Sequence, residues 1–176
     1  MNKAICSLNF MYSMERFATS IYRFQKSVFK QPAINEKMIN AVDNEAQHAS
    51  NLRKRIIALN YTPFKLAFLF QMGGTILGCV SRCFSKESAL KIDVLIEKRA
   101  VKDYSDFLKT LELDDKTKVL IKNIITDEEM HIKTWHDSIK LLKSKPRGKD
   151  KGTKPRKKGL KKKEENHDHC TCIEIR

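Results

Sequence analysis

Four long segments of this chain combine two features. Each has apolar residues at the three- and four-residue spacing of an amphipathic helix, and each carries a glutamate inside that apolar stripe. The segments run over roughly 7–30, 33–60, 86–111 and 114–143. The glutamates are Glu15, Glu45, Glu97 and Glu128. Because burying an unpaired carboxylate is costly, four of them on inward faces need a specific reason.

The composition favours helices over a sheet. Six glycines and four prolines among 176 residues are fewer than a many-stranded sandwich or barrel needs for its turns. This length suits one domain with its own core. The link Leu113-Asp114-Asp115 is short, so the last two segments should be antiparallel neighbours. The sequence therefore predicts an all-α four-helix bundle.

Two of the glutamates belong to a repeated motif, Glu-x-x-His. It occurs as Glu45-Ala-Gln-His48 and as Glu128-Glu-Met-His131. A spacing of three residues puts both side chains on the same side of a helix, one turn apart. Along the four segments the order is Glu, Glu-x-x-His, Glu, Glu-x-x-His, which is the ligand pattern of ferritin-like di-iron carboxylate bundles. The expected metal ligands are Glu15, Glu45, His48, Glu97, Glu128 and His131.

The residue types suit a pair of metal ions. Several carboxylates offset the charge of two divalent ions, and one imidazole per ion adds a nitrogen ligand suited to iron. We expect Glu45 and Glu128 to bridge the ions, the other two glutamates to be terminal ligands, and each histidine to bind one ion. The predicted cofactor is two iron ions, with manganese as an alternative because it accepts the same ligands.

Four further residues are candidates for supporting these ligands. Asn44 and Asp127 directly precede the two motif glutamates and could accept the second N–H of a ligand histidine; the alternative is an ordinary solvated position. Tyr22 and Tyr104 follow a glutamate by seven residues. They are either donors or radical relays at the site, with Tyr104 the expected catalytic residue, or ordinary core tyrosines.

The same residues resemble known families. The elements Glu15-x6-Tyr22 and Glu97-x6-Tyr104 resemble the Glu-x6-Tyr elements of rubrerythrins and bacterioferritins. Over roughly residues 11–136 the chain more closely resembles the demethoxyubiquinone hydroxylase family. That likeness rests on the ligand spacing and on a pattern formed by Pro63, Gly74, Leu77, Gly78, Ala89, Glu97 and Tyr104. It implies a ferritin-like fold, a di-iron centre, hydroxylation of a quinone ring late in ubiquinone synthesis, and membrane docking through residues 63–84.

The chain departs from that family at two places. It has Tyr12-Ser13-Met14-Glu15 where the hydroxylases usually have a His-Ala-Gly-Glu-like run, and Asp103 where they often have histidine.

The run Leu66–Ser81 is apolar and carries no charge over 16 residues. It is shorter than the roughly 20 residues that a spanning helix needs, and its Gly73-Gly74 pair suggests two short helical pieces in a crossover between the second and third bundle helices. Lys65 and Arg82 flank it as interfacial anchors would. We expect membrane contact or substrate access here; a quinone channel, an oligomer interface and a buried crossover are the alternatives. The residues expected to take part are Phe68, Leu69, Phe70, Ile76 and Leu77.

Residues 144–176 are expected to form a basic, low-complexity, disordered tail after a bundle domain at 1–143. The chain has a net charge of +14, and residues 143–163 contain 12 lysines or arginines and one aspartate. We expect a solubilising tail, with contact to anionic lipid or non-specific contact to nucleic acid as alternatives, and no specific nucleic-acid partner.

The sequence as a whole predicts a di-iron monooxygenase that hydroxylates a quinone or quinol ring with O2. The alternatives are a rubrerythrin-like peroxidase and a non-enzymatic iron-binding or structural bundle. Five cysteines without a Cys-x-x-Cys pair exclude a rubredoxin module within the chain. The expected partners are a quinone-like lipid, an electron donor of unknown identity and a second copy of the chain. The expected location is cytoplasmic, peripheral on the inner face of the cell membrane.

Overall fold

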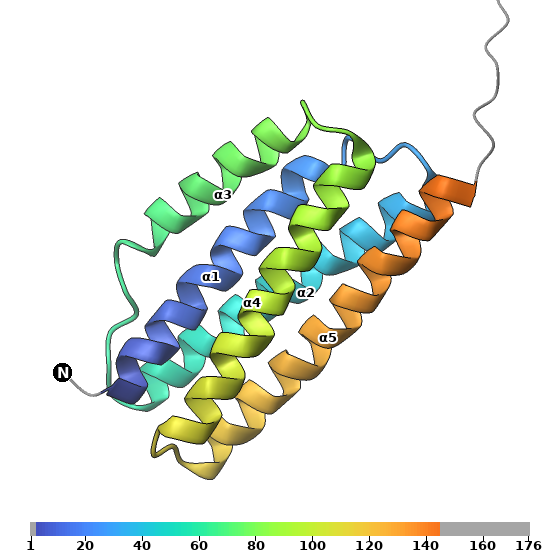
Figure 1. Ribbon diagram of the computed structural model, residues 1–176. Coiled ribbons are helices and arrows are strands. Elements are labelled where there is room, and N and C mark those ends of the chain that lie inside the picture. The colour runs from blue at the N-terminus through green and yellow to red at the C-terminus, as the bar shows by residue number, and fades with distance from the viewer. Residues whose placement is uncertain (1–2, 145–176) are drawn as a thin grey trace, which may run out of the picture. The chain divides into compact units, whose positions relative to one another are not determined.

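The structure is a computed structural model and describes residues 3–144, which form five helices and no strand (Figure 1). The helices are α1 Lys3–Gln25, α2 Pro32–Ala58, α3 Ala67–Ser81, α4 Lys86–Thr110 and α5 Asp115–Ser144. The four long helices make an antiparallel bundle, and α3 lies in the crossover between α2 and α4, packed on the outside of α1. This confirms the predicted all-α, ferritin-like four-helix bundle.

Local signals set the helix starts. Pro32 occupies the first turn of α2, where its missing N–H has no helical partner to lose. The Ser85 hydroxyl accepts a hydrogen bond from the Ser88 N–H at 3.1 Å and begins α4. The Asp114 carboxylate does the same for the Thr117 N–H at 3.1 Å and begins α5. Each of these three helices therefore starts within two residues of its predicted position.

The first helix ends earlier than the periodicity suggested. α1 stops at Gln25, whereas the stripe continues to Phe29. Phe29 is buried, but it reaches the core from the turn that leads to α2. The residue before a proline avoids the helical region, and Gln31 is extended with φ −76° and ψ 119°. The chain must therefore leave the helix before Pro32. Phe29 lies in the turn but is apolar and buried, so it appeared in the sequence as a continuation of the helical stripe.

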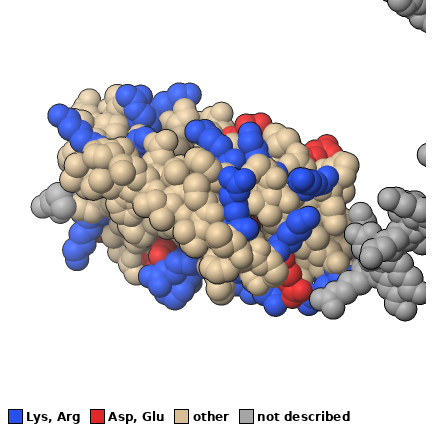
Figure 2. Space-filling model, turned by 90° about the horizontal axis from the view of Figure 1, so that it is seen from above, with Lys and Arg blue, Asp and Glu red and all other residues tan. Residues whose placement is uncertain are grey.

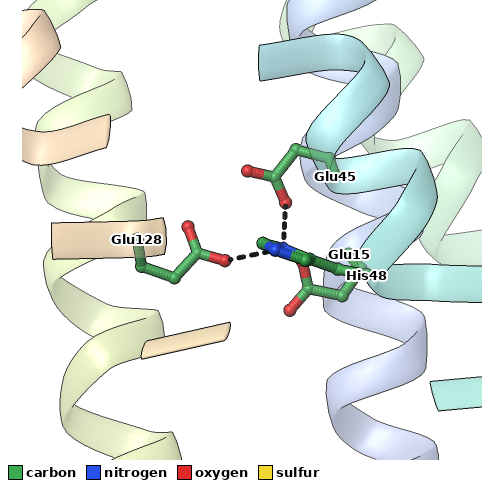
Figure 3. Close-up of side chains that lie close together, drawn as sticks. All are labelled: Glu15, Glu45, His48 and Glu128. Carbon is green, nitrogen blue, oxygen red and sulfur yellow. Dashed lines mark ion pairs between the residues drawn. The ribbon is translucent and has the colours of Figure 1, made fainter. Parts of the chain in front are cut away.

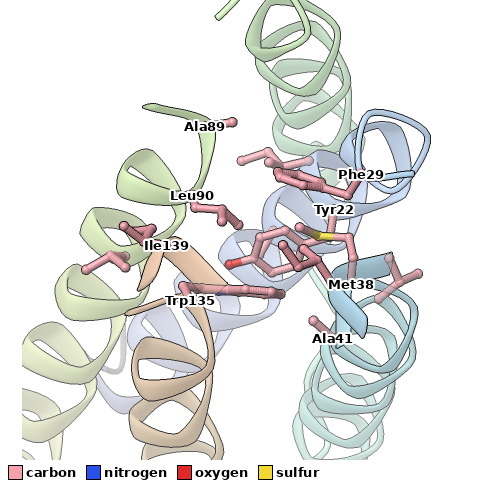
Figure 4. Close-up of a cluster of buried hydrophobic side chains, with 13 residues drawn as sticks. Tyr22, Phe29, Met38, Ala41, Ala89, Leu90, Trp135 and Ile139 are labelled. Carbon is pink, nitrogen blue, oxygen red and sulfur yellow. The ribbon is translucent and has the colours of Figure 1, made fainter. Parts of the chain in front are cut away.

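Two clusters of buried apolar side chains make the core. The first holds the Tyr22 and Trp135 rings with Phe29 and Met38 (Figure 4). The second lies towards the start of α1 and includes the side chain of Tyr104. On each long helix the in-stripe glutamate falls between residues of the first cluster and residues of the second. The acids are therefore sandwiched between two water-excluding layers.

The prediction of two short pieces in the crossover is wrong, because α3 is one continuous helix from Ala67 to Ser81. Its glycines serve close packing instead. A Cβ on Gly74 would overlap the Phe17 carbonyl oxygen, and one on Gly78 would lie 2.9 Å from the Ile21 carbonyl oxygen. Both contacts are with the backbone of α1, so only glycine lets the two helices approach this closely.

Among the described helices, none combines the length and the apolarity needed to cross a membrane. The predictions for the basic tail at 145–176 fall outside the described residues.

Candidate metal centre

Six polar side chains from four helices meet in the layer between the two apolar clusters. They are Glu15 from α1, Glu45 and His48 from α2, Glu97 from α4, and Glu128 and His131 from α5. Each of the four glutamates is only 1% exposed. The structure thus brings together the six residues that the sequence singled out, from positions up to 116 residues apart in the chain.

The six residues form two overlapping groups. Glu15 and His48 belong to the first group, and Glu97 and His131 belong to the second. Glu45 and Glu128 belong to both, and within each group the potential ligand atoms lie within 4.8 Å of one another. The two shared carboxylates therefore lie where bridging ligands between two ions would lie.

The first group is arranged around the His48 ring (Figure 3). Its Nδ1 lies 3.4 Å from a Glu15 oxygen, 3.4 Å from a Glu128 oxygen and 3.8 Å from a Glu45 oxygen. Three carboxylates from three helices thus point at one imidazole nitrogen.

The second group repeats this arrangement around His131. Its Nδ1 lies 2.9 Å from a Glu45 oxygen, 3.3 Å from a Glu128 oxygen and 3.4 Å from a Glu97 oxygen. In both groups the histidine and the glutamate one helical turn before it enter the same cluster, as the Glu-x-x-His spacing predicted.

Several of these buried atoms make no hydrogen bond with any described residue. They are both carboxylate oxygens of Glu45, one of Glu128, and Nδ1 of His48 and of His131. Leaving such atoms unsatisfied is costly, and native interiors avoid it. All of them face the same small space, and carboxylate oxygen with imidazole nitrogen is a donor set for divalent transition metals. The residues therefore fit two metal ions.

The electrostatics lead to the same conclusion. Burial, and then the charge of Glu45, raises the pKa of Glu15 to about 8. Burial and the neighbouring carboxylates raise the pKa of Glu128 well above its usual value. Burial lowers the pKa of His131, but the adjacent carboxylates of Glu128 and Glu45 outweigh this and raise it to about 12. Without a cation the cluster must hold protons to offset its negative charge, and metal binding would displace them.

Two buried tyrosines donate hydrogen bonds to Glu15 and Glu97, the glutamates that each belong to only one of the two groups. The Tyr104 hydroxyl donates to a Glu15 oxygen at 2.6 Å, and the Tyr22 hydroxyl donates to a Glu97 oxygen. Each tyrosine therefore serves the glutamate of the other helix, not the one seven residues before it. Because α1 and α4 are antiparallel, two equal Glu-x6-Tyr spacings place each tyrosine level with the opposite glutamate. Local sequence had no means of indicating this pairing.

The two residues that precede the motif glutamates differ in their surroundings. Asp127 Oδ2 lies 3.0 Å from His48 Nε2, where it can accept the ring N–H that faces away from the cluster. Asn44 is half-buried, and its side-chain oxygen makes no hydrogen bond with any residue that the structure describes. It lines a surface hollow near His131 instead. Glu129 is exposed, as its position on the helix predicted.

A second buried acid on α4 was not given a role from sequence. Asp93 is fully buried one turn before Glu97, and it accepts a hydrogen bond from Gln25 Nε2 at 3.0 Å. Burial raises the pKa of Asp93 well above its usual value. The one indication in the sequence that Asp93 is buried was its position in the same apolar stripe as Glu97.

The residues expected to give membrane or substrate access divide into two sets. Phe68, Leu69 and Ile76 are exposed on α3, Ile76 to 62%. Phe70 and Leu77 turn inward: Leu77 packs on the first apolar cluster, and Phe70 lines a hollow of about 680 Å³ between α1 and the α2–α3 connection. The other residues of that hollow are Ile5, Cys6, Asn9, Phe10, Ser13, Tyr61, Thr62 and Phe64. In the face seen from above, basic side chains lie around broad uncharged areas (Figure 2).

Comparison with known proteins points to one family. A family model described as ubiquinone biosynthesis protein COQ7 matches residues 13–147. The chain is 30% identical over 127 residues to an NADPH-dependent 3-demethoxyubiquinone 3-hydroxylase, mitochondrial, of Dictyostelium discoideum, covering 69% of this chain and 58% of that protein. It is 27% identical over 121 residues to a 3-demethoxyubiquinol 3-hydroxylase of Francisella tularensis subsp. novicida, covering 68% and 57%. The chain thus spans less than two thirds of the length of either relative.

Proposed function

Because this chain belongs to the COQ7 family of ubiquinone biosynthesis proteins, we propose that it is a di-iron monooxygenase that hydroxylates the ring of a demethoxyquinone-type lipid. One observation carries the proposal: two carboxylate–imidazole groups share Glu45 and Glu128 in a dry layer of the bundle. The names of the relatives supply the substrate class, since both are demethoxyubiquinone or demethoxyubiquinol hydroxylases.

In this proposal the six residues form two equivalent ligand sets that share two glutamates. Glu45 and Glu128, which belong to both groups, would serve both ions, Glu15 and His48 would complete one site, and Glu97 and His131 would complete the other. Iron held by these residues would activate O2, so that one oxygen atom enters a ring C–H bond and the other leaves as water, with two electrons from an external reductant and two protons. The apolar clusters on both sides of the layer keep water away from the reacting groups.

The two tyrosines orient the terminal carboxylates. The Tyr104 hydroxyl contacts one oxygen of Glu15 and leaves free the oxygen that faces His48, whereas the Tyr22 hydroxyl contacts the same Glu97 oxygen that faces His131. Burial, and then the adjacent carboxylates, raise the pKa of Tyr22 and of Tyr104 well above the usual value, so both remain hydrogen-bond donors. Tyr104 is the proposed catalytic residue, as a hydrogen-bond donor or radical relay at the site. Asp127 supports His48 by accepting its outer N–H, which fixes the nitrogen that faces the centre.

The apolar hollow and the exposed face of α3 fit a lipid substrate. A volume of about 680 Å³ lies within the range of about 300–1,000 Å³ typical of ligand sites. Its lining includes Ser13, which lies on α1, the helix that also carries Glu15. We propose that the isoprenoid tail lies in this hollow while the exposed side chains of α3 rest on the bilayer, with Lys65 and Arg82 at its edges.

Turnover by the iron-loaded protein tests the function. The full chain would be loaded anaerobically with Fe(II), given a demethoxyquinol in detergent, a reductant and O2, and analysed for the hydroxylated product; a second arm would use NADPH, the donor in the name of the Dictyostelium relative. Glu128→Gln should abolish product formation, because it removes a shared carboxylate. Glu129→Gln is the matched control, since that neighbour is exposed. If the wild type forms no hydroxylated product but consumes peroxide, the peroxidase alternative replaces the hydroxylase.

A further inference from the structure

A basic hollow lies where α1, α2 and α3 meet, and it shares no residue with the metal centre. Its volume is about 290 Å³. It is lined by Tyr12, Arg16, Thr19, Ser20, Arg23, Ala46, Ala49, Ser50, Arg53 and Gln71. Three of these residues are arginines and none is acidic.

The helices build this hollow from two stripes. On α1 the lining residues recur at positions 12, 16, 19, 20 and 23, which is one face of a helix. On α2 the facing positions hold Ala46, Ala49 and Ser50. These short side chains leave the space, and the longer side chains of Arg23 and Arg53 stand at its edge, where both are exposed.

One of the arginines is held in place by its neighbours. The Arg16 guanidinium donates to the Tyr12 hydroxyl at 3.2 Å and to the side-chain oxygen of Gln71. Gln71 belongs to α3, so the packing of α3 on α1 orients this guanidinium. A positioned guanidinium loses less conformational freedom when it binds an anion.

The other two arginines have no acidic partner among the described residues. Neither Arg23 nor Arg53 takes part in an ion pair with a described residue, and both line the same hollow as the Arg16 guanidinium. Two arginines outside the hollow are paired: Arg55 lies 2.5 Å from an Asp114 oxygen and Arg99 lies 2.7 Å from an Asp103 oxygen. Clustered cations without acids repel one another, and an anion between them would remove that repulsion.

We propose that this hollow binds a phosphate group. Guanidinium groups match phosphate oxygens in a two-pronged geometry, and the hydroxyls of Ser20 and Ser50 offer further donors. The phosphate would come either from a soluble phosphate ester or from a phospholipid headgroup, because α3 borders both the hollow and the exposed apolar face. The proposal is independent of the proposed function.

Arginine-specific labelling tests the site without interference from the basic tail. The full chain would be treated with phenylglyoxal, and the modification of each arginine would be followed by peptide mass spectrometry. One arm would add pyrophosphate, a second arm would add vesicles of phosphatidylcholine with phosphatidic acid, and sodium chloride would match the ionic strength. We expect modification of Arg23 and Arg53 to slow at least about threefold, while Arg99, exposed on α4, keeps its rate. Protection by pyrophosphate identifies a soluble ligand, and protection by vesicles alone identifies a headgroup.

A pair of double variants provides the second measurement. Arg23→Gln with Arg53→Gln should weaken pyrophosphate binding, measured by titration calorimetry, by roughly tenfold for each arginine. Lys122→Gln with Lys133→Gln removes the same charge from exposed positions on α5 and should leave the affinity within about twofold. Equal effects of the two pairs, or no protection of Arg23 and Arg53 in either arm, would overturn the proposal.

Discussion

Two adjacent glycines of α3 should respond in opposite ways to the same substitution. At Gly73 a Cβ would lie 3.6 Å from the Phe17 ring, which is an ordinary contact. Gly73→Ala should therefore stabilise the protein by about 0.5–1 kcal/mol, the gain in helix propensity. At Gly74 the Cβ would lie 3.0 Å from the Phe17 carbonyl carbon, and still closer to its oxygen. Those atoms belong to the backbone of α1 and cannot rotate away.

The expected size of the second effect follows from the same contacts. Overpacking of this kind costs typically about 1–3 kcal/mol, and here α3 must move by roughly 1 Å to relieve it. Subtracting the gain in propensity, Gly74→Ala should destabilise the protein by about 1–2 kcal/mol. At roughly 2–4 °C per kcal/mol, thermal unfolding should separate the two variants by about 3–12 °C. A Gly74→Ala variant as stable as Gly73→Ala would refute the close packing of α3 on α1.

Three further outcomes are expected. Adding Fe(II) or Mn(II) at 100 times its dissociation constant should stabilise the fold by about 2.7 kcal/mol, measured as a rise in the unfolding temperature that a chelator reverses; no rise would speak against a metal centre. Tyr104→Phe should lower turnover while leaving the metal content unchanged, because it removes only the hydrogen bond to Glu15; unchanged turnover would remove Tyr104 from the mechanism. Asp114→Ala should cost about 1 kcal/mol, through loss of the α5 cap, in urea unfolding at pH 7. The Arg55 guanidinium lowers the pKa of Asp114 below its usual 3.8, so this contribution is present above about pH 4 and fades as the pH falls further, and an equal cost at pH 2 would contradict it.

The carboxylate and histidine cluster of the candidate metal centre could be predicted because its signals are local. A glutamate in an apolar stripe and a histidine one turn later are fixed relative to each other by the geometry of a single helix. Four such helices in an antiparallel bundle have few ways to bury those faces. Glu45 and Glu128 therefore come together near the middle of the bundle's length. Asp127 followed from the same local rule, since it directly precedes Glu128.

The features that sequence missed all depend on how one helix lies against another. Periodicity says which face of a helix is buried, but not how closely a neighbour approaches. The glycines of α3 therefore suggested a break, although they accommodate the backbone of α1. Likewise, the crossed bonds from Tyr104 to Glu15 and from Tyr22 to Glu97 depend on the relative height of two helices.

The amino-acid sequence alone thus determined the four long helices, their inward faces and the six potential ligands, because each follows from spacing within one helix. Only the tertiary structure decided the crossed tyrosines, the continuous α3 and the arginine-lined hollow, because side chains from α1, α2 and α3 must be placed together before a distance between them exists.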